Sequence, residues 1–213
     1  MSALVTLVCG YRRTGKDKLY EILSGKSSGG FKWRIYRVPR TYGVPKFNES
    51  KTYIRVAFAD ALKREAAEEY KIPPVIPDNE KDVKKFRHHK TGEMVSARDI
   101  YIEWGAVRRE QDINYWCKAA IDNIPDDSDT NCIITDWRYL NELKYVLSTG
   151  VNFAAVRLYR SDVPEPPSDI ESEHNLDYCA TDYLLLRDDL PGEFERAVKR
   201  FPQYHDYESC DCI

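Results

Sequence analysis

The chain has 213 residues, a length that fits one α/β domain of ordinary size with or without an inserted subdomain. Hydrophobic residues make up 42% and charged residues 31%, which excludes disordered and fibrous proteins and supports a sizeable core. The net charge of −3 provides no global field that attracts nucleic acid or an anionic membrane. Any anion-binding site must therefore be local.

No apolar run approaches the ~20 residues of a membrane-spanning helix, and the first residues lack the features of a signal peptide. We therefore expect a cytoplasmic protein with no membrane contact. The six cysteines are scattered without zinc-type spacing, so we expect neither a disulfide framework nor a cysteine metal site. The last four residues, Cys210 to Ile213, do not match a prenylation signal and are expected to form a frayed acidic tail.

The N-terminal segment predicts half of a βαβ unit. Ala3–Cys9 is a continuous apolar run, which is typical of a central parallel strand covered on both faces. It ends at Gly10, and residues 18–23 then have apolar side chains at helical spacing. The order is strand, loop, helix.

Residues 25–50 form a basic insertion. Between residues 24 and 51 there are seven basic residues and only one acidic residue, a local charge of +6. Residues 31–38 alternate with the period of a strand, so a strand or hairpin with a solvated basic face is the favoured interpretation. A contact with a polynucleotide, or a cluster that collects substrate phosphates, remains open.

The rest of the chain alternates strands and helices. Further strands are expected at 52–58, 131–135, 151–158 and 182–186, and helices at 59–70, from Ser96 to about Trp116, at 141–147 and at 191–201. This alternation predicts an α/β domain over residues 1–213, with a five-stranded parallel sheet and helices on both faces.

The most specific motif is Gly-x-x-x-x-Gly-Lys between the first strand and its helix, from Gly10 to Lys16. In that context the loop amides and the helix N-terminus bind phosphate groups, and Lys16 reaches the β- and γ-phosphates of ATP. The remaining ATP-binding candidates of the loop are Arg12, Arg13, Thr14, Gly15 and Asp17. Asp17 replaces the usual hydroxyl residue, and its carboxylate is a candidate Mg²⁺ ligand. The alternative interpretation is a simple glycine turn.

Four more segments accompany this loop: Phe58–Lys63, Trp104 to Trp116, Asp136–Glu142 and Glu171 to Asp177. Together with residues 10–17 they resemble the bacteriophage-type deoxynucleoside monophosphate kinases of the P-loop nucleoside monophosphate kinase superfamily, to which the animal-type phosphomevalonate kinases are related. The resemblance covers most of the chain except the basic insertion. It implies a P-loop kinase domain in which Glu142 helps to hold the substrate nucleotide.

Two charged residues follow the third buried strand. Asp136 stands where open parallel sheets place ligand-binding groups, and it is a candidate for Mg²⁺ and for the substrate, or alternatively a helix cap. Arg138 can offer a planar fork to a phosphate. Glu142, four residues later, is alternatively an ion-pair partner within a helix.

Arg98, Arg108 and Trp116 are candidates for the acceptor pocket, because arginines bind a monophosphate and an aromatic plane stacks on a base. Trp116 is equally compatible with the core. Residues 160–175 are irregular and rich in proline, as expected of a closing lid. Arg160 would meet the transferring phosphoryl group there, or else neutralise Asp162 or Glu165.

These features predict an ATP- and Mg²⁺-dependent kinase that phosphorylates deoxynucleoside 5′-monophosphates to diphosphates. Lys16, Asp17, Arg138 and Arg160 are the predicted catalytic residues, and Asp17 and Asp136 the predicted metal ligands. A phosphomevalonate kinase is the first alternative. An ATP-sensing module that binds nucleic acid through the basic insertion is the second, and a homodimer is left open.

Overall fold

The computed structural model describes residues 4–26, 33–37, 52–125 and 129–212. The chain forms two compact units. The first unit comprises Met1–Val56 and Ile124–Ile213, and the second comprises Ala57–Asn123. Each unit is described by itself.

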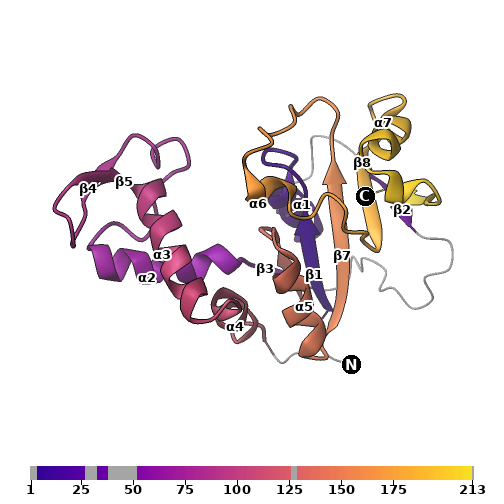
Figure 1. Ribbon diagram of the computed structural model, residues 1–213. Helices are drawn as coiled ribbons and strands as arrows, with labels where there is room; N and C mark the ends of the chain where they lie inside the picture. The colour runs from indigo at the N-terminus through magenta and orange to yellow at the C-terminus, as the bar shows by residue number, and fades with distance from the viewer. Residues whose placement is uncertain (1–3, 27–32, 38–51, 126–128, 213) are drawn as a thin grey trace. The chain divides into compact units, whose positions relative to one another are not determined.

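A seven-stranded sheet forms the centre of the first unit, in the order β3-β6-β1-β7-β8-β2-β9. The strands are β1 (Leu4–Cys9), β2 (Trp33–Arg37), β3 (Thr52–Val56), β6 (Thr130–Ile134), β7 (Asn152–Tyr159), β8 (Tyr183–Arg187) and β9 (Glu208–Cys212). The first five strands of that order are all parallel, and β1, β7 and β8 run side by side in Figure 1. They correspond to the five strands predicted from the sequence.

The prediction of a sheet limited to five strands is wrong, because β2 and β9 extend it with antiparallel pairs. β2 pairs with β8, where Arg34 lies opposite Leu186, so this part of the basic insertion joins the sheet edge. The expected frayed tail instead forms β9, which pairs with β2 and satisfies its outer backbone groups. Residues 27–32 and 38–51 of the insertion lie outside the described residues.

Helices cover both faces of this sheet, as predicted. On one face α1 (Lys16–Leu23) packs with Leu19 against a cluster that contains Tyr183 and Leu185. On the other face Leu184 and Leu186 pack against α7 (Glu193–Arg200) and the 3₁₀ helix η1 (Pro202–Tyr204). Successive residues of β8 thus point into different layers. The remaining helices of this unit are α5 (Leu140–Ser148) and α6 (Glu171–His174).

The second unit contains three helices and a hairpin among its described residues. These elements are α2 (Phe58–Tyr70), β4 (Lys85–Arg87), β5 (Met94–Ser96), α3 (Ala97–Gln111) and α4 (Tyr115–Ile121). Ser96 caps α3 as predicted, because its hydroxyl accepts a hydrogen bond from the Asp99 amide at 3.1 Å. The single long helix expected here is divided, since Asp112 adopts an extended conformation and its carboxylate accepts from the Asn114 amide at 2.9 Å.

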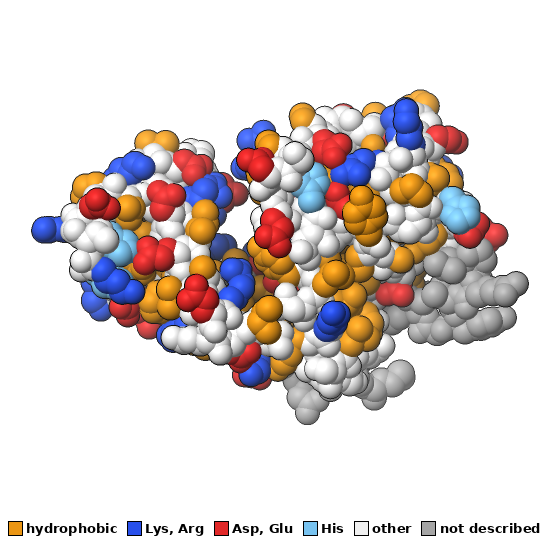
Figure 2. Space-filling view, in the orientation of Figure 1, with side chains coloured by type: hydrophobic (Ala, Val, Ile, Leu, Met, Phe, Trp, Pro, Cys, Tyr) orange, Lys and Arg blue, Asp and Glu red, His pale blue; other side chains and the backbone are white. Residues whose placement is uncertain are grey.

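In the part of the chain that the structure describes, no helix combines the length and the apolar composition that crossing a membrane requires. Figure 2 shows basic and acidic side chains interspersed on the visible face of both units. That face therefore presents no extended patch of one charge sign.

Candidate functional site

The glycine loop, residues 10–16, connects β1 to α1 in a conformation that requires its two glycines. Gly10 has φ 142° and Gly15 has φ 103°, both in the region that side chains disfavour. A Cβ atom at Gly10 would lie 2.5 Å from the backbone oxygen of Leu158 on β7. Thr14 is buried, and its hydroxyl donates to the Tyr11 carbonyl at 2.8 Å, which closes the loop.

Lys16, the first residue of α1, bends back over the glycine loop. Its Nζ donates to the carbonyl oxygen of Gly10 at 2.6 Å and to that of Tyr11 at 2.9 Å. Burial, and next the positive charge of Arg138, lower the pKa of Lys16 to about 8. The ammonium group is therefore held at the loop in a position that disfavours its charge, and an anion would compensate that cost.

The start of α1 presents backbone N–H groups. Among the described residues, the N–H groups of Gly15, Lys16 and Asp17 make no hydrogen bond to another backbone group. Arg12 and Arg13 have exposed side chains, and Arg13 adopts φ 69°, which is uncommon for a residue with a side chain. Amides at the start of a helix, together with an ammonium group, are the chemistry of a phosphate site.

A carboxylate from elsewhere in the chain already binds one amide of this loop. Glu173 of α6 accepts a hydrogen bond from the backbone N–H of Arg12 at 2.8 Å, and its other oxygen accepts from the Arg138 guanidinium. Its side chain is only 6% exposed. Burial by itself would raise the pKa of Glu173, but the hydrogen bond and charge of Arg138 outweigh it and lower that pKa below its ordinary value. The loop therefore holds an anion in this structure.

Glu142 positions the backbone of Arg138. Its carboxylate accepts from the backbone N–H groups of Arg138 at 2.8 Å and Tyr139 at 3.0 Å, at the start of α5. It is buried and forms a capping box rather than the ion pair within a helix considered above. The contact with a substrate nucleotide that the resemblance implied stays a prediction.

Asp17, on the first turn of α1, is joined to the ends of two parallel strands. Its Oδ1 accepts from the hydroxyl of Thr135 at 3.0 Å and from the Nε of Arg55 at 3.1 Å. Thr135 directly follows β6 and precedes the partly exposed Asp136. The oxygen-bearing side chains of Asp17 and Thr135 thus meet at the carboxyl ends of these strands, where open parallel sheets place ligand-binding groups.

The donor types at Asp17, Thr135 and Asp136 fit a hard cation such as Mg²⁺, which prefers oxygen ligands and keeps several waters. No group of three or more His, Cys, Asp or Glu side chains in the described ranges is placed to bind a metal. Protein side chains alone therefore do not form a metal cage here. A cation at this edge would also depend on ligands from phosphate or water.

Arg160 pairs with Asp162. Neutralising this carboxylate was the alternative that the sequence left open to a contact with the phosphoryl group. The Nε of Arg160 lies 3.0 Å and its Nη2 2.7 Å from the two carboxylate oxygens, which is a bidentate ion pair. Residues 160–170 contain turns but no helix or strand, as expected of a lid segment. A contact between Arg160 and a transferring phosphoryl group stays a prediction.

The other three predicted substrate residues lie in the second unit. Arg108 pairs with Glu65 at 3.1 Å, and its guanidinium lies over the rings of Trp104 at 4.8 Å and Tyr115 at 5.1 Å. Arg98 pairs with Asp82 at 2.5 Å. These contacts hold both guanidinium groups on acidic partners within their own unit.

Trp116 is only 3% exposed, and its indole N–H donates to the Gly105 carbonyl at 3.2 Å. The conformation in the structure therefore agrees with the core role that the sequence left open for this residue. Stacking on a base would require the indole to become exposed.

Asp177 connects the lid segment to the glycine loop and to α7. Its Oδ2 accepts from the Tyr11 hydroxyl at 3.0 Å and from Arg200 at 2.7 Å, and it lies 2.9 Å from His174 Nδ1. Nε2 of His174 faces the carbonyl oxygens of Pro166 and Pro167, each at 3.2 Å. The hydrogen bond to Asp177 raises the pKa of His174, so the protonated ring is favoured.

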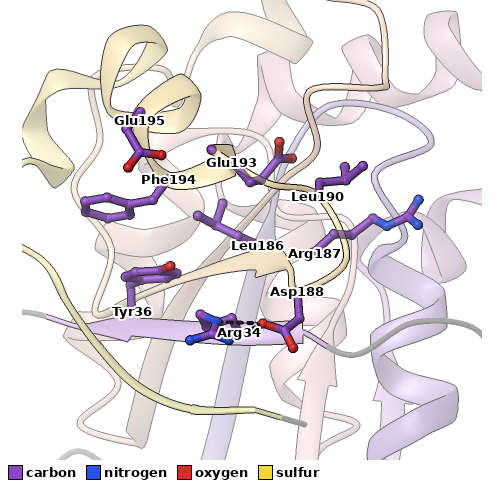
Figure 3. Close-up of a pocket in the computed structure, with 10 residues that line it drawn as sticks. Arg34, Tyr36, Leu186, Arg187, Asp188, Leu190, Glu193, Phe194 and Glu195 are labelled. Atoms are coloured by element: carbon purple, nitrogen blue, oxygen red, sulfur yellow. Dashed lines mark hydrogen bonds and ion pairs between the residues drawn. The ribbon is translucent and has the colours of Figure 1, made fainter.

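A separate pocket lies at the carboxyl end of β8. Figure 3 shows the ring of Tyr36 facing that of Phe194, and their centroids are 4.5 Å apart with an angle of 15° between the ring planes. Arg34 pairs with Asp188 at its edge. The volume of this pocket, about 240 Å³, is smaller than the ~300 Å³ of the smallest typical ligand pockets. No predicted site residue lines it.

The sequence reasoning missed three contributors to the site: Tyr11, Arg55 and Thr135. Glu173 and Asp177 were noted only as part of a family segment. The position of Thr135 at the end of a buried strand was a usable signal, because such positions face the ligand edge of a parallel sheet. The contacts of Tyr11 and Asp177 join residues 166 positions apart and had no local signal.

No protein-family model matches this sequence, and a search of curated proteins finds no significant match. The functional argument therefore depends on the residues and their geometry.

We expect Gly10→Ala to destabilise the protein strongly. The new Cβ would clash with the Leu158 carbonyl, and φ 142° would be strained. Gly150→Ala is the matched control, because φ is 71° and no atom lies within 4 Å of the added Cβ. Urea denaturation should give a loss at least about 2 kcal/mol larger for Gly10→Ala. Equal losses would contradict the close approach of loop and strand.

We also expect His174 to make stability depend on pH. Its pKa is raised above the ordinary value of 6.5 in the folded state. Its contribution is therefore fully present below that value and is lost as the pH rises through the folded pKa. In urea denaturation, the loss of stability caused by His174→Gln should be larger at about pH 5.5 than at about pH 8.5. A stability gap that does not change with pH would exclude this role.

Proposed function

We propose that this protein is an ATP-dependent kinase that transfers the γ-phosphoryl group to the 5′-phosphate of a deoxynucleoside monophosphate. One observation carries the proposal: the glycine loop and Arg138 already hold a carboxylate, beside Lys16. A loop amide and a guanidinium that bind one anion, with an ammonium group on the same loop, suit the phosphates of a nucleotide. The resemblance to deoxynucleoside monophosphate kinases supports the same conclusion.

The transfer requires little proton movement, because the acceptor phosphate is already anionic. An oxygen of the acceptor forms a bond to the γ-phosphorus while the bond from that phosphorus to the β,γ-bridging oxygen breaks, and ADP leaves. The protein contributes alignment and charge neutralisation. Lys16 and the loop amides bind the donor, and Arg138 neutralises charge where donor and acceptor phosphates meet.

Asp17 and Asp136 would hold Mg²⁺, with the Thr135 hydroxyl fixing the orientation of Asp17. The ion would supply positive charge to the phosphates. Arg55 also donates to Asp17, and this contact sets the carboxylate at the same edge of the sheet as the loop. These residues therefore bind and orient, and none of them needs to act as a nucleophile.

The acceptor class is the open choice within this proposal. Phosphomevalonate is the alternative acceptor, because the segments from Trp104 to Trp116 and from Glu171 to Asp177 resemble both kinase groups. Both acceptors are anionic phosphates, so the same charged groups would serve either reaction. The residues that would read a base, such as Trp116, stay predictions.

The decisive experiment is a coupled assay of ADP formation with ATP, Mg²⁺ and one acceptor at a time. The acceptors are dGMP, dTMP, dAMP and phosphomevalonate. We expect turnover with at least one deoxynucleotide and at least a ~10³-fold loss in Lys16→Ala, because the loop then lacks its ammonium group.

Lys18→Ala is the matched control, since Lys18 lies on the same helix and pairs with Glu21 at 3.0 Å. It should retain near-normal turnover. Turnover of phosphomevalonate alone would reassign the acceptor, and near-normal turnover by Lys16→Ala would contradict the donor site.

The lowered pKa of Lys16 predicts an alkaline limit to activity. As the pH rises through about 8, free enzyme loses the ammonium proton, and kcat/KM for ATP should fall with a midpoint near that pH. Lys16→Arg keeps its charge, so its residual kcat/KM should stay level between about pH 7 and 9. If the variant shows the same alkaline decline, another group must titrate.

A further inference from the structure

The Glu173 carboxylate links three segments that are far apart in the sequence. Glu173 belongs to the four-residue helix α6, whereas its donors are the Arg12 amide after β1 and the Arg138 guanidinium before α5. Each carboxylate oxygen takes one of these donors. One side chain thereby engages both sides of the proposed phosphate site.

The chemistry of these donors suits a phosphate group as well as a carboxylate. A backbone N–H group and a guanidinium both form charge-assisted hydrogen bonds with either anion. Glu173 is almost fully buried in this position, so no second anion can use the same donors without moving it. Glu173 and a phosphate that binds these two donors therefore exclude one another.

We infer that Glu173 is an intramolecular competitor for the phosphate site of the glycine loop, and that a bound phosphate group displaces it. This inference rests on the proposed function only for the identity of the site. The fraction of molecules with Glu173 displaced limits the apparent affinity for any anion that needs these donors. Displacement passes the Arg138 guanidinium from Glu173 to the phosphate and removes the contact between α6 and the loop, which links donor binding to the acceptor side and to the lid segment.

Other contacts allow α6 to stay attached while Glu173 moves. His174 pairs with Asp177, and Asn175 accepts from the Leu140 amide at 3.2 Å. Neither contact involves the glycine loop amides. Release of Glu173 therefore requires a change at one side chain and its short helix, and leaves the anchor at Asp177 in place.

The test measures binding of inorganic pyrophosphate, without Mg²⁺ or acceptor, by isothermal titration calorimetry. Glu173→Gln removes the competing charge, and Glu171→Gln is the matched control because Glu171 lies exposed on the same helix. We expect Glu173→Gln to bind pyrophosphate about tenfold more tightly than wild type. Glu171→Gln should stay within about twofold of wild type.

Three results would overturn the inference: no gain or a weaker affinity in Glu173→Gln, an equal gain in Glu171→Gln, or no pyrophosphate binding by any variant. Hydrogen exchange of the wild-type protein provides a second measurement if Glu173→Gln does not fold. Saturating pyrophosphate should increase exchange within α6, and unchanged or slower exchange would overturn the inference. A protein that gains affinity as expected but transfers no phosphoryl group would refute the proposed kinase activity alone.

Discussion

The candidate site depends on the close approach of the glycine loop to β7. At Gly10 the backbone passes so near the Leu158 carbonyl that a single methyl group would not fit. This approach turns the chain sharply after β1 and directs the start of α1, with its N–H groups, toward the carboxyl edge of the sheet. The positions of Lys16 and Asp17 follow from that turn, because they are the first two residues of the helix.

A loop built in this way accumulates positive potential, and the chain supplies its own anion to balance it. Lys16 and Arg138 lie close enough for the charge of Arg138 to lower the pKa of Lys16. Glu173 compensates both charges, and its own pKa falls in return. Charged residues with perturbed pKa values that lie together in this way are typical of functional sites. Deeper in the unit, Asp177 neutralises Arg200 and fixes the segment that carries Glu173.

The sequence predicted what depends on local patterns. Apolar and strand-forming segments identified the five parallel strands, and two glycines with a lysine at fixed spacing identified the loop. It did not predict that β9 pairs with β2, because that pairing joins distant segments and the tail lacks a strong strand pattern. The sequence also did not predict the partners of Arg138 and Asp17, because Glu173 and Thr135 are distant from them in sequence and come close only in the folded chain. Charged residues with several candidate partners are assigned only by tertiary structure.

The pairing of Arg98, Arg108 and Arg160 with carboxylates bears on how these predicted substrate and catalytic residues would act. Each guanidinium has an acidic partner from its own unit, at 2.5 Å from Asp82, 3.1 Å from Glu65 and 2.7 Å from Asp162. Exposed pairs contribute only about 0–1 kcal/mol, so a doubly charged phosphate would replace the carboxylate at small cost at Arg98, whose pair is the most exposed of the three. The carboxylate partner of Arg138 is Glu173, which is more buried. Replacing it with a phosphate should therefore cost more free energy. If these arginines bind phosphates as proposed, each must exchange a carboxylate for a phosphate, and burial of the carboxylate sets how strongly the substrate must bind to make that exchange.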